Sequence, residues 1–191
     1  MNSNIEILGL IFNILNYAFV FLFIFNLLKV NYFNPIVSTF VKVYKPISKV
    51  FGIFPIQAIN ILVIAIALKL LSLIIYFGSQ YETLSLFGVA IIQTLMVTLR
   101  IIFFAVIGGV ILSWVSPEKS NAFLELVEEI SYKSLAPIRK YIPSAGGLDF
   151  SPLFVLILNT KLGWFFVAEN FKFFPAFILI CLLYTSDAAD E

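Results

Sequence analysis

The chain has 191 residues, of which 61% are hydrophobic and only 12% charged, and its mean hydropathy is +1.04. A soluble globular domain is about half apolar and about a quarter charged, so this composition indicates a helical membrane protein and argues against nucleic-acid binding. The chain contains no histidine, which excludes His-ligated zinc or haem and any nucleophile activated by histidine. We therefore expect no cofactor.

The last residues, 181–191, break abruptly from the Phe- and Ile-rich sequence before them. They resemble the conceptual translation of a sequencing adaptor, so we expect this tail to be foreign to the protein and exclude it from fold reasoning. The tail holds the single cysteine, Cys181, which can form no disulfide within the chain. Without the three acids of the tail, 12 Lys and Arg stand against 8 Asp and Glu, a net charge of +4.

Four apolar stretches are long enough, or nearly so, to cross a membrane. The hydrocarbon core of a bilayer is about 30 Å thick, which takes roughly 20 apolar residues in a helix. We expect spans at about 5–28, 55–77, 93–115 and 151–168. The fourth begins at Ser151-Pro152, where a serine N-cap precedes a proline in the first helical turn. The predicted fold class is therefore an all-α membrane protein with four transmembrane helices.

The two long loops between these spans are basic. Residues 29–52 contain four lysines and no acid, and residues 116–150 contain Lys119, Lys133, Arg139 and Lys140. The N-terminus and the short turn at 78–84 contain no Lys or Arg. By the positive-inside rule, both long loops face the cytoplasm and both termini lie on the other side of the membrane.

The second loop contains its own helical pattern. Apolar residues recur at three- and four-residue steps and charged residues occupy the other side, the two sets being Phe123, Leu126, Val127 and Ile130, and Glu125, Glu128, Glu129 and Lys133. This spacing predicts an amphipathic helix. The helix either lies in the membrane surface with its apolar face among the headgroups, or packs on the cytoplasmic end of the bundle, and the sequence favours neither.

The two halves of the chain show the same order of features. A shift of 87 residues overlays the first span on the third and Asn34 on Asn121, and an insertion of about four residues then pairs Lys69 with Lys161. Each unit contains a span, a basic loop, a proline turn and a second span, so we expect two parallel hairpin repeats, residues 1–85 and 86–180. An overlay of Pro46 on Pro137 needs a shift of 91, so the register stays open.

The most informative motif lies between the second loop and the fourth span. Residues 135–152 run Leu-Ala-Pro-Ile-Arg-Lys-Tyr-Ile-Pro-Ser-Ala-Gly-Gly-Leu-Asp-Phe-Ser-Pro, and Ser113-Trp114 closes the third span. This pattern resembles the YggT family of small integral membrane proteins, whose repeat combines a span ending in Ser-Trp with a Pro-Ile-Arg, Pro, Gly-Gly-x-Asp-x-Ser-Pro run. The resemblance covers most of residues 90–162. The first half keeps Asn34-Pro35 and Lys45-Pro46 but lacks the Gly-Gly pair and the Asp.

This motif supplies the candidate docking and structural residues. They are Ser113, Trp114, Pro137, Arg139, Lys140, Pro143, Gly146, Gly147, Asp149, Ser151 and Pro152. The prolines limit helix continuation, and the Gly-Gly pair allows a tight turn back into the membrane. Asp149 has two interpretations: it fixes the loop as a turn or capping residue, with Arg139 as a candidate partner, or it forms with Arg139 and Lys140 a docking face for a protein or an anionic lipid. Ser113 and Trp114 are explained first as a helix-end and aromatic-belt pair and second as a contact.

Two lysines, Lys69 and Lys161, fall inside the predicted spans at overlaid positions. A lysine at mid-depth costs about 2.5–3.5 kcal/mol on insertion scales. By default such side chains extend to the membrane boundary. The alternative is a polar seam between the repeats, with partners among Asn13, Asn16, Gln93 and Asn159. In the third span, Gly108-Gly109 can let another helix approach closely.

The resemblance also carries expectations about function. Relatives have been associated with cell division and envelope organisation, with osmotic tolerance and, in plastids, with the assembly of membrane complexes. We predict a non-catalytic scaffold or assembly factor acting through the basic loops, with the lipid bilayer and other membrane or division proteins as partners and a homo-oligomer as a further option. The alternative is a small channel or transporter at the repeat interface. Catalysis is not expected, because Asp149 is the only Asp before the tail and an aspartyl intramembrane protease needs two acids.

Overall fold

The computed structural model describes residues 3–50, 54–115 and 121–140, together with positions 151, 152, 154, 155, 157 and 161. The elements in this part of the chain are all helices: α1 (Ser3–Leu27), α2 (Pro35–Val50), α3 (Gln57–Phe77), α4 (Thr83–Val115) and α5 (Ala122–Arg139). The six separate positions are helical as well. The predicted all-α class is confirmed for these residues.

Three helices are long and apolar enough to cross a membrane, over Ile5–Leu27, Gln57–Phe77 and Thr83–Ser113. At 1.5 Å per residue they are about 35, 32 and 47 Å long, against a hydrocarbon core of about 30 Å. The first two agree with the predicted spans to within two residues. The chain is therefore a membrane protein by the length and composition of these helices.

The predicted start of the third span, at residue 93, was wrong. α4 begins ten residues earlier, at Thr83, because the turn after α3 is short and the apolar sequence resumes at Leu84. The fourth predicted span, 151–168, lies mostly outside the described residues, and a four-span topology stays a prediction. The described positions from 151 to 161 are helical, and Val155 packs with Val106 of α4 and Leu135 of α5.

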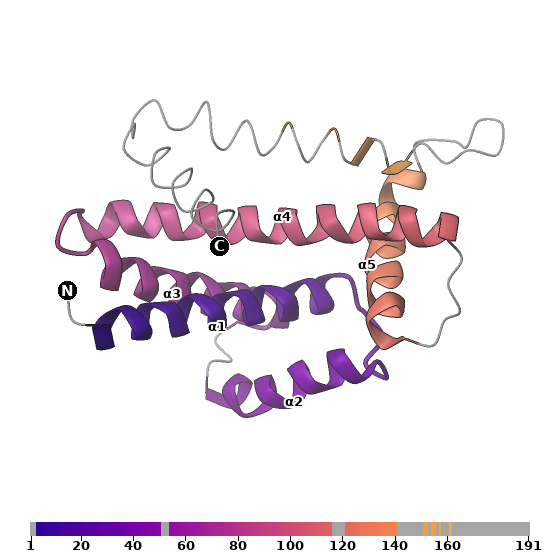
Figure 1. The fold of residues 1–191 in the computed structure, drawn as a ribbon. Coiled ribbons are helices and arrows are strands. Elements are labelled where there is room, and N and C mark those ends of the chain that lie inside the picture. The colour runs from indigo at the N-terminus through magenta and orange to yellow at the C-terminus, as the bar shows by residue number, and fades with distance from the viewer. Residues whose placement is uncertain are drawn as a thin grey trace.

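α1, α3 and α4 run side by side, and the shorter helix α2 starts close to the start of α5 and runs back along the C-terminal half of α1 (Figure 1). α1 and α3 are antiparallel, and α5 runs across the C-terminal part of α4. All five helices contribute to one core, which includes Val20, Ile24, Phe25, Val37, Tyr44, Ile61, Ala65, Ala105, Leu126 and Ile130. The starts of α2 and α5 therefore lie together at one end of the bundle.

α5 is packed on two sides: Leu126 and Ile130 join the main core, whereas Leu135 packs with Val106 and Val155. Leu126, Ile130 and Leu135 are buried, whereas Phe123 and Tyr132 are exposed. The expectation that Pro137 limits the helix was too strict, because α5 continues through it to Arg139. Proline lacks the backbone donor that would bond to the carbonyl four residues earlier, and α5 continues for only two residues beyond it.

Candidate functional site

α5 rests on a pair of glycines in α4. A β-carbon on Gly108 would lie 2.8 Å from a methyl group of Val127, and one on Gly109 would lie 2.3 Å from the hydroxyl oxygen of Ser131. Such distances are shorter than any normal contact, so the two helices approach this closely only because both positions lack a side chain. Val127 and Ser131 are four residues apart and lie on one face of α5. We call this contact the glycine seat.

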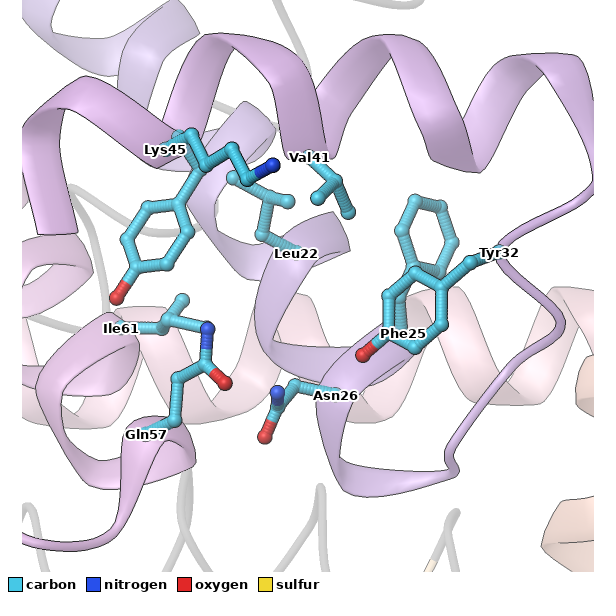
Figure 2. A pocket seen from close by; sticks show the side chains of 9 residues that line it. Leu22, Phe25, Asn26, Tyr32, Val41, Lys45, Gln57 and Ile61 are labelled. Carbon is cyan, nitrogen blue, oxygen red and sulfur yellow. The ribbon is translucent and has the colours of Figure 1, made fainter.

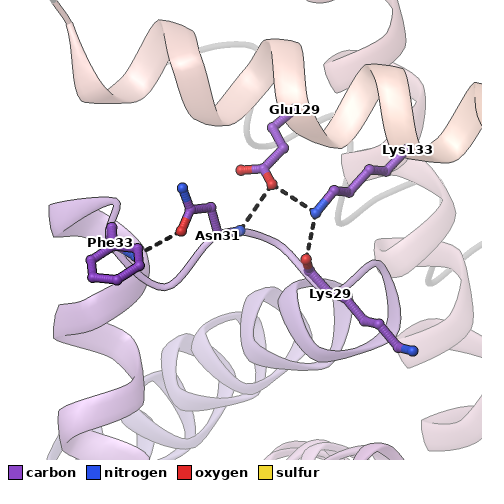
Figure 3. A network of polar contacts seen from close by, with 5 residues as sticks. All are labelled: Lys29, Asn31, Phe33, Glu129 and Lys133. Carbon is purple, nitrogen blue, oxygen red and sulfur yellow. Dashed lines mark hydrogen bonds and ion pairs between the residues drawn. The ribbon is translucent and has the colours of Figure 1, made fainter.

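A second set of contacts ties α5 to the turn between α1 and α2 (Figure 3). Glu129 accepts a hydrogen bond from the backbone N–H of Asn31 at 2.9 Å and forms an ion pair with Lys133 at 2.7 Å. The Lys133 ammonium also donates to the backbone carbonyl of Lys29. Lys29 has a φ of 51°, in the left-handed region that side chains rarely adopt. The Glu129–Lys133 pair therefore fixes this strained turn against α5.

Two asparagines begin the two short helices in the same way. The side-chain oxygen of Asn34 accepts from the N–H of Ile36 at 3.0 Å, and that of Asn121 accepts from the N–H of Phe123 at 2.9 Å. Each satisfies a donor in the first turn that the helix leaves unpaired. These are the two residues that the 87-residue shift overlays. Asn34 also donates to the carbonyl of Ala122 at 2.7 Å, which joins the starts of α2 and α5.

A pocket of about 490 Å³ lies at the α4–α5 crossing, lined by residues that include Gly109, Ser113, Glu125, Glu128, Tyr132 and Arg139. Its lining is both acidic and basic. The Arg139 guanidinium lies 5.1 Å from the centre of the Tyr132 ring, close enough for a cation–π interaction. The structure thus brings Ser113 and Arg139, two of the predicted docking residues, to one pocket from two helices.

The other predicted docking residues divide into two groups. Pro137 lies in the last turn of α5, Lys140 caps that helix and is exposed, Ser151 is buried and Pro152 is half-buried. Trp114 lies in the last turn of α4, and its side chain is outside what the structure describes. Pro143, Gly146, Gly147 and Asp149 are outside the described residues, so the predicted pairing of Asp149 with Arg139 stays a prediction.

A ladder of polar contacts runs along the interface between α1 and α3. Its four hydrogen bonds are Tyr76 hydroxyl to Glu6 carbonyl (3.0 Å), Ser72 hydroxyl to Gly9 carbonyl (3.0 Å), Lys69 ammonium to Asn13 side chain (2.9 Å) and Asn16 amide to Ala65 carbonyl (2.8 Å). Lys69 is only 8% exposed, so its side chain does not extend to the membrane boundary. Lys161, its predicted companion, is helical and exposed.

The ladder brings α1 and α3 close together at Gly9, where a β-carbon would lie 2.7 Å from the Tyr76 ring. It also reaches α4, because the Asn16 amide lies 3.3 Å from the Thr94 hydroxyl. Interhelical hydrogen bonds of this kind help to hold membrane helices together. The ladder therefore explains how three apolar helices keep one register.

Sequence reasoning placed Glu129 and Lys133 on the polar face of a helix and did not select them as site residues. Their four-residue spacing predicts an ion pair along the helix. Their contacts with Lys29 and Asn31 depend on the packing of α5 against a distant turn, which spacing does not reveal. Among the residues that the structure describes, no group of three or more His, Cys, Asp or Glu side chains is arranged to hold a metal ion.

Comparison with known proteins identifies a family model and several relatives that match the chain. The CCB3/YggT family model matches residues 88–168. The uncharacterized protein PA0392 of Pseudomonas aeruginosa is 44% identical over 68 residues, 36% of this chain and 34% of that protein. An uncharacterized protein of Haemophilus influenzae is 30% identical over 135 residues, 68% of this chain and 72% of that protein. The uncharacterized protein YggT of Escherichia coli is 30% identical over 134 residues, 67% of this chain and 70% of that protein.

No solved structure matches the chain. The relatives carry no assigned activity in their names, so they establish kinship and not a role. The matched region, 88–168, includes α5, the glycine seat and the pocket beside it. Together with the Ser-Trp and Gly-Gly-x-Asp-x-Ser-Pro motifs, these matches show that the chain belongs to the YggT family.

Proposed function

We propose that this chain is a non-catalytic membrane scaffold that holds a protein partner on the surface formed by α5 and the end of α4. The observation that carries the proposal is the pocket at the crossing, where Ser113 and Arg139 meet beside Glu125 and Glu128. Fixed charges of both signs on an exposed helix select a partner with the complementary charge pattern. The pocket lies in the part of the chain that matches the family model.

The way α5 is held supports a docking role. The glycine seat fixes it on α4, and the Glu129–Lys133 pair fixes it on the turn at Lys29 and Asn31. A surface that is ordered before binding loses little conformational entropy when a partner arrives, so more of the contact energy appears as affinity. The described surface therefore suits recognition better than a loop that must first fold.

We also propose that α2 and α5 face the cytoplasm and that both termini lie outside the bacterial inner membrane. The support is the concentration of Lys and Arg in residues 29–52 and 116–150. A cysteine introduced as Glu125→Cys in a Cys181→Ser background tests this placement. A membrane-impermeant maleimide is expected to label inside-out vesicles and not right-side-out vesicles, and the opposite pattern would reverse the topology.

The docking proposal is tested by photo-crosslinking in cells. A photoreactive amino acid replaces the exposed Tyr132 on α5 or, as a control, the exposed Phe104 on α4, which faces away from the pocket lining. We expect one discrete protein adduct from position 132 and none from position 104. The adduct should disappear with Arg139→Ala and persist with Lys42→Ala, a matched loss of an exposed cation on α2. Identical adducts in all variants, or lipid adducts only, would contradict the scaffold.

Transport is the second candidate, and the ladder is the observation in its favour. Lys69 is buried among three helices, and the side-chain oxygen of the neighbouring Asn16 has no hydrogen-bond partner among the described atoms. Such a site could take part in moving an ion or a proton. Ion flux in reconstituted vesicles distinguishes the two functions: flux that is lost with Lys69→Ala and kept with Arg139→Ala favours transport, and the absence of flux favours the scaffold.

A further inference from the structure

A second cavity, of about 320 Å³, lies between α1, α2 and α3, at the end of the bundle where α1 ends and α3 begins (Figure 2). Its volume falls at the lower end of the range for small-molecule pockets, about 300–1,000 Å³. Two of its lining residues, Tyr32 and Lys45, are exposed, so the cavity reaches the surface. It shares no lining residue with the pocket at the α4–α5 crossing.

The cavity exists because the first half of the chain has no glycine seat. Gly108 precedes its capping residue Asn121 by 13 residues, and Phe21 precedes Asn34 by the same distance. The ring of Phe21 contacts Phe40 of α2 at 6.0 Å between centroids. Phe40 also meets Phe25, at 5.8 Å, and Tyr44 meets Phe19, at 6.1 Å. In the first half, aromatic rings therefore lie between the backbones of α1 and α2. In the second half, two glycines let α5 touch the backbone of α4.

The lining of the cavity is divided by polarity. Leu22, Phe25, Val41 and Ile61 form an apolar part. The amides of Asn26 and Gln57 and the hydroxyl of Tyr32 point toward the same open space, and Lys45 lies on the side formed by α2 (Figure 2). An occupant that satisfies both parts has a hydrocarbon segment joined to a polar group.

The charge around the cavity selects an anion. Residues 29–56 contain Lys29, Lys42, Lys45 and Lys49 and no acid. The acid that contacts this segment from α5, Glu129, is paired with Lys133. Lysines at the membrane surface each attract anionic lipids with about 1 kcal/mol. A molecule that carries both hydrocarbon and a negative charge, and that is abundant at the boundary of a membrane helix, is an anionic phospholipid.

We propose that the cavity between α1, α2 and α3 is a binding site for one anionic phospholipid of the surrounding bilayer. Part of an acyl chain fills the space beside Leu22, Val41 and Ile61, and the phosphate lies at the mouth near Lys45. Asn26 supplies a hydrogen-bond donor to the glycerol and phosphate region, whereas the Gln57 side chain is hydrogen-bonded to Tyr44 in the cavity wall. The bound lipid would add contacts between α2 and the bundle beside those that the aromatic rings already make.

The experiment is native mass spectrometry of the whole chain in mild detergent, titrated with phosphatidylglycerol or phosphatidylcholine. We expect one phosphatidylglycerol to be retained per chain, in preference to phosphatidylcholine. Val41→Trp fills the cavity without changing charge and should abolish that adduct. Lys45→Gln should weaken it about fivefold, the effect of one lysine at a membrane surface. Lys42→Gln is the matched control, because this exposed lysine is on the same helix and does not line the cavity.

Three results would overturn the proposal. One is equal retention of phosphatidylcholine, and another is an equal loss of phosphatidylglycerol with Lys42→Gln and Lys45→Gln, which would indicate general attraction to the basic segment. The third is an unchanged adduct in a Val41→Trp protein that keeps its unfolding temperature in lipid-free detergent. If Val41→Trp lowers that temperature, Val41→Phe, a smaller side chain that fills part of the same space, gives the same comparison. None of these variants changes α5. The scaffold proposal can therefore be refuted while the proposal of a lipid site remains supported.

Discussion

The close crossing of α4 and α5 requires the absence of a side chain at Gly109. In Gly109→Ala, the new β-carbon would lie 2.3 Å from the Ser131 hydroxyl oxygen and 2.4 Å from the Ser131 β-carbon. Non-bonded carbon atoms pack at about 3.5–4.0 Å. Rotating the serine side chain moves its oxygen but not its β-carbon, so the two helices must separate by roughly 1 Å at this point.

The expected change in the stability of Gly109→Ala is the difference between two opposing contributions. Overpacking of a tight contact costs about 1–3 kcal/mol. Replacing a glycine in a helix by alanine returns roughly 0.5–1 kcal/mol. The expected net loss is therefore about 1–2 kcal/mol, which for a chain of this size lowers the unfolding temperature by roughly 2–8 °C. The assay is thermal unfolding of the purified protein in mild detergent, followed by tryptophan fluorescence.

Gly88 provides the matched control for this prediction. It lies on the same helix, and a β-carbon there meets nothing within 4 Å, so Gly88→Ala should leave the unfolding temperature unchanged or raise it. Adding Ser131→Gly to Gly109→Ala should recover stability beyond the sum of the two single effects, because the clash is then removed. If Gly109→Ala proves as stable as Gly88→Ala, the glycine seat does not determine how α5 packs.

Three other predictions concern the remaining contacts. Lys69→Met removes the hydrogen bond from Lys69 to the Asn13 side chain and should destabilise the bundle by about 1 kcal/mol, whereas Lys69→Met with Asn13→Leu should recover most of the loss in the same unfolding assay. Asn34→Asp keeps the helix cap but loses the bond to Ala122, so it should lower stability less than Asn34→Ala, whose lost cap alone costs about 1 kcal/mol. Burial raises the pKa of Tyr44, so its neutral form stabilises the fold fully below about pH 10 and this contribution is lost at higher pH; Tyr44→Phe should flatten the fall of the unfolding temperature between about pH 9.5 and 11.

Composition and apolar runs were sufficient to locate α1 and α3, because each run is bounded by clear signals: Lys29 follows the first and Pro55 precedes the second. Composition and apolar runs did not predict where α4 begins. The turn at 78–82 is only a few polar residues long, and a window of 20 residues placed around the most apolar part begins too late. The helix runs on because nothing between Leu84 and Gln93 stops it.

The candidate sites were predictable only where the type of residue itself indicates a contact. Gly108-Gly109 indicated a close helix contact, but no pattern identifies α5 as the partner. The sequence offered Asn13 and Asn16 as partners of Lys69 in a seam between the two repeats. The structure pairs Lys69 with Asn13, and Asn16 with Ala65, so this ladder lies between α1 and α3, inside the first predicted repeat. Its other acceptors are backbone carbonyls, among them those of Gly9 and Ala65, which have no polar side chain that a sequence could reveal.

Side-chain volume at one position accounts for the difference between the two halves of the chain. Both halves begin a short helix with an asparagine cap after an apolar helix, and both short helices start at the same end of the bundle. With glycines at 108 and 109, α5 touches α4, and its outward face stays fixed and carries charges of both signs beside exposed aromatic rings, which suits a protein partner. With phenylalanine at 21, the short helix is held off and leaves a half-apolar cavity, which suits a lipid. The scaffold and the lipid site are therefore consequences of one structural unit packed at two separations, and exchanging glycine for a bulky residue at 108 should convert the first kind of surface toward the second.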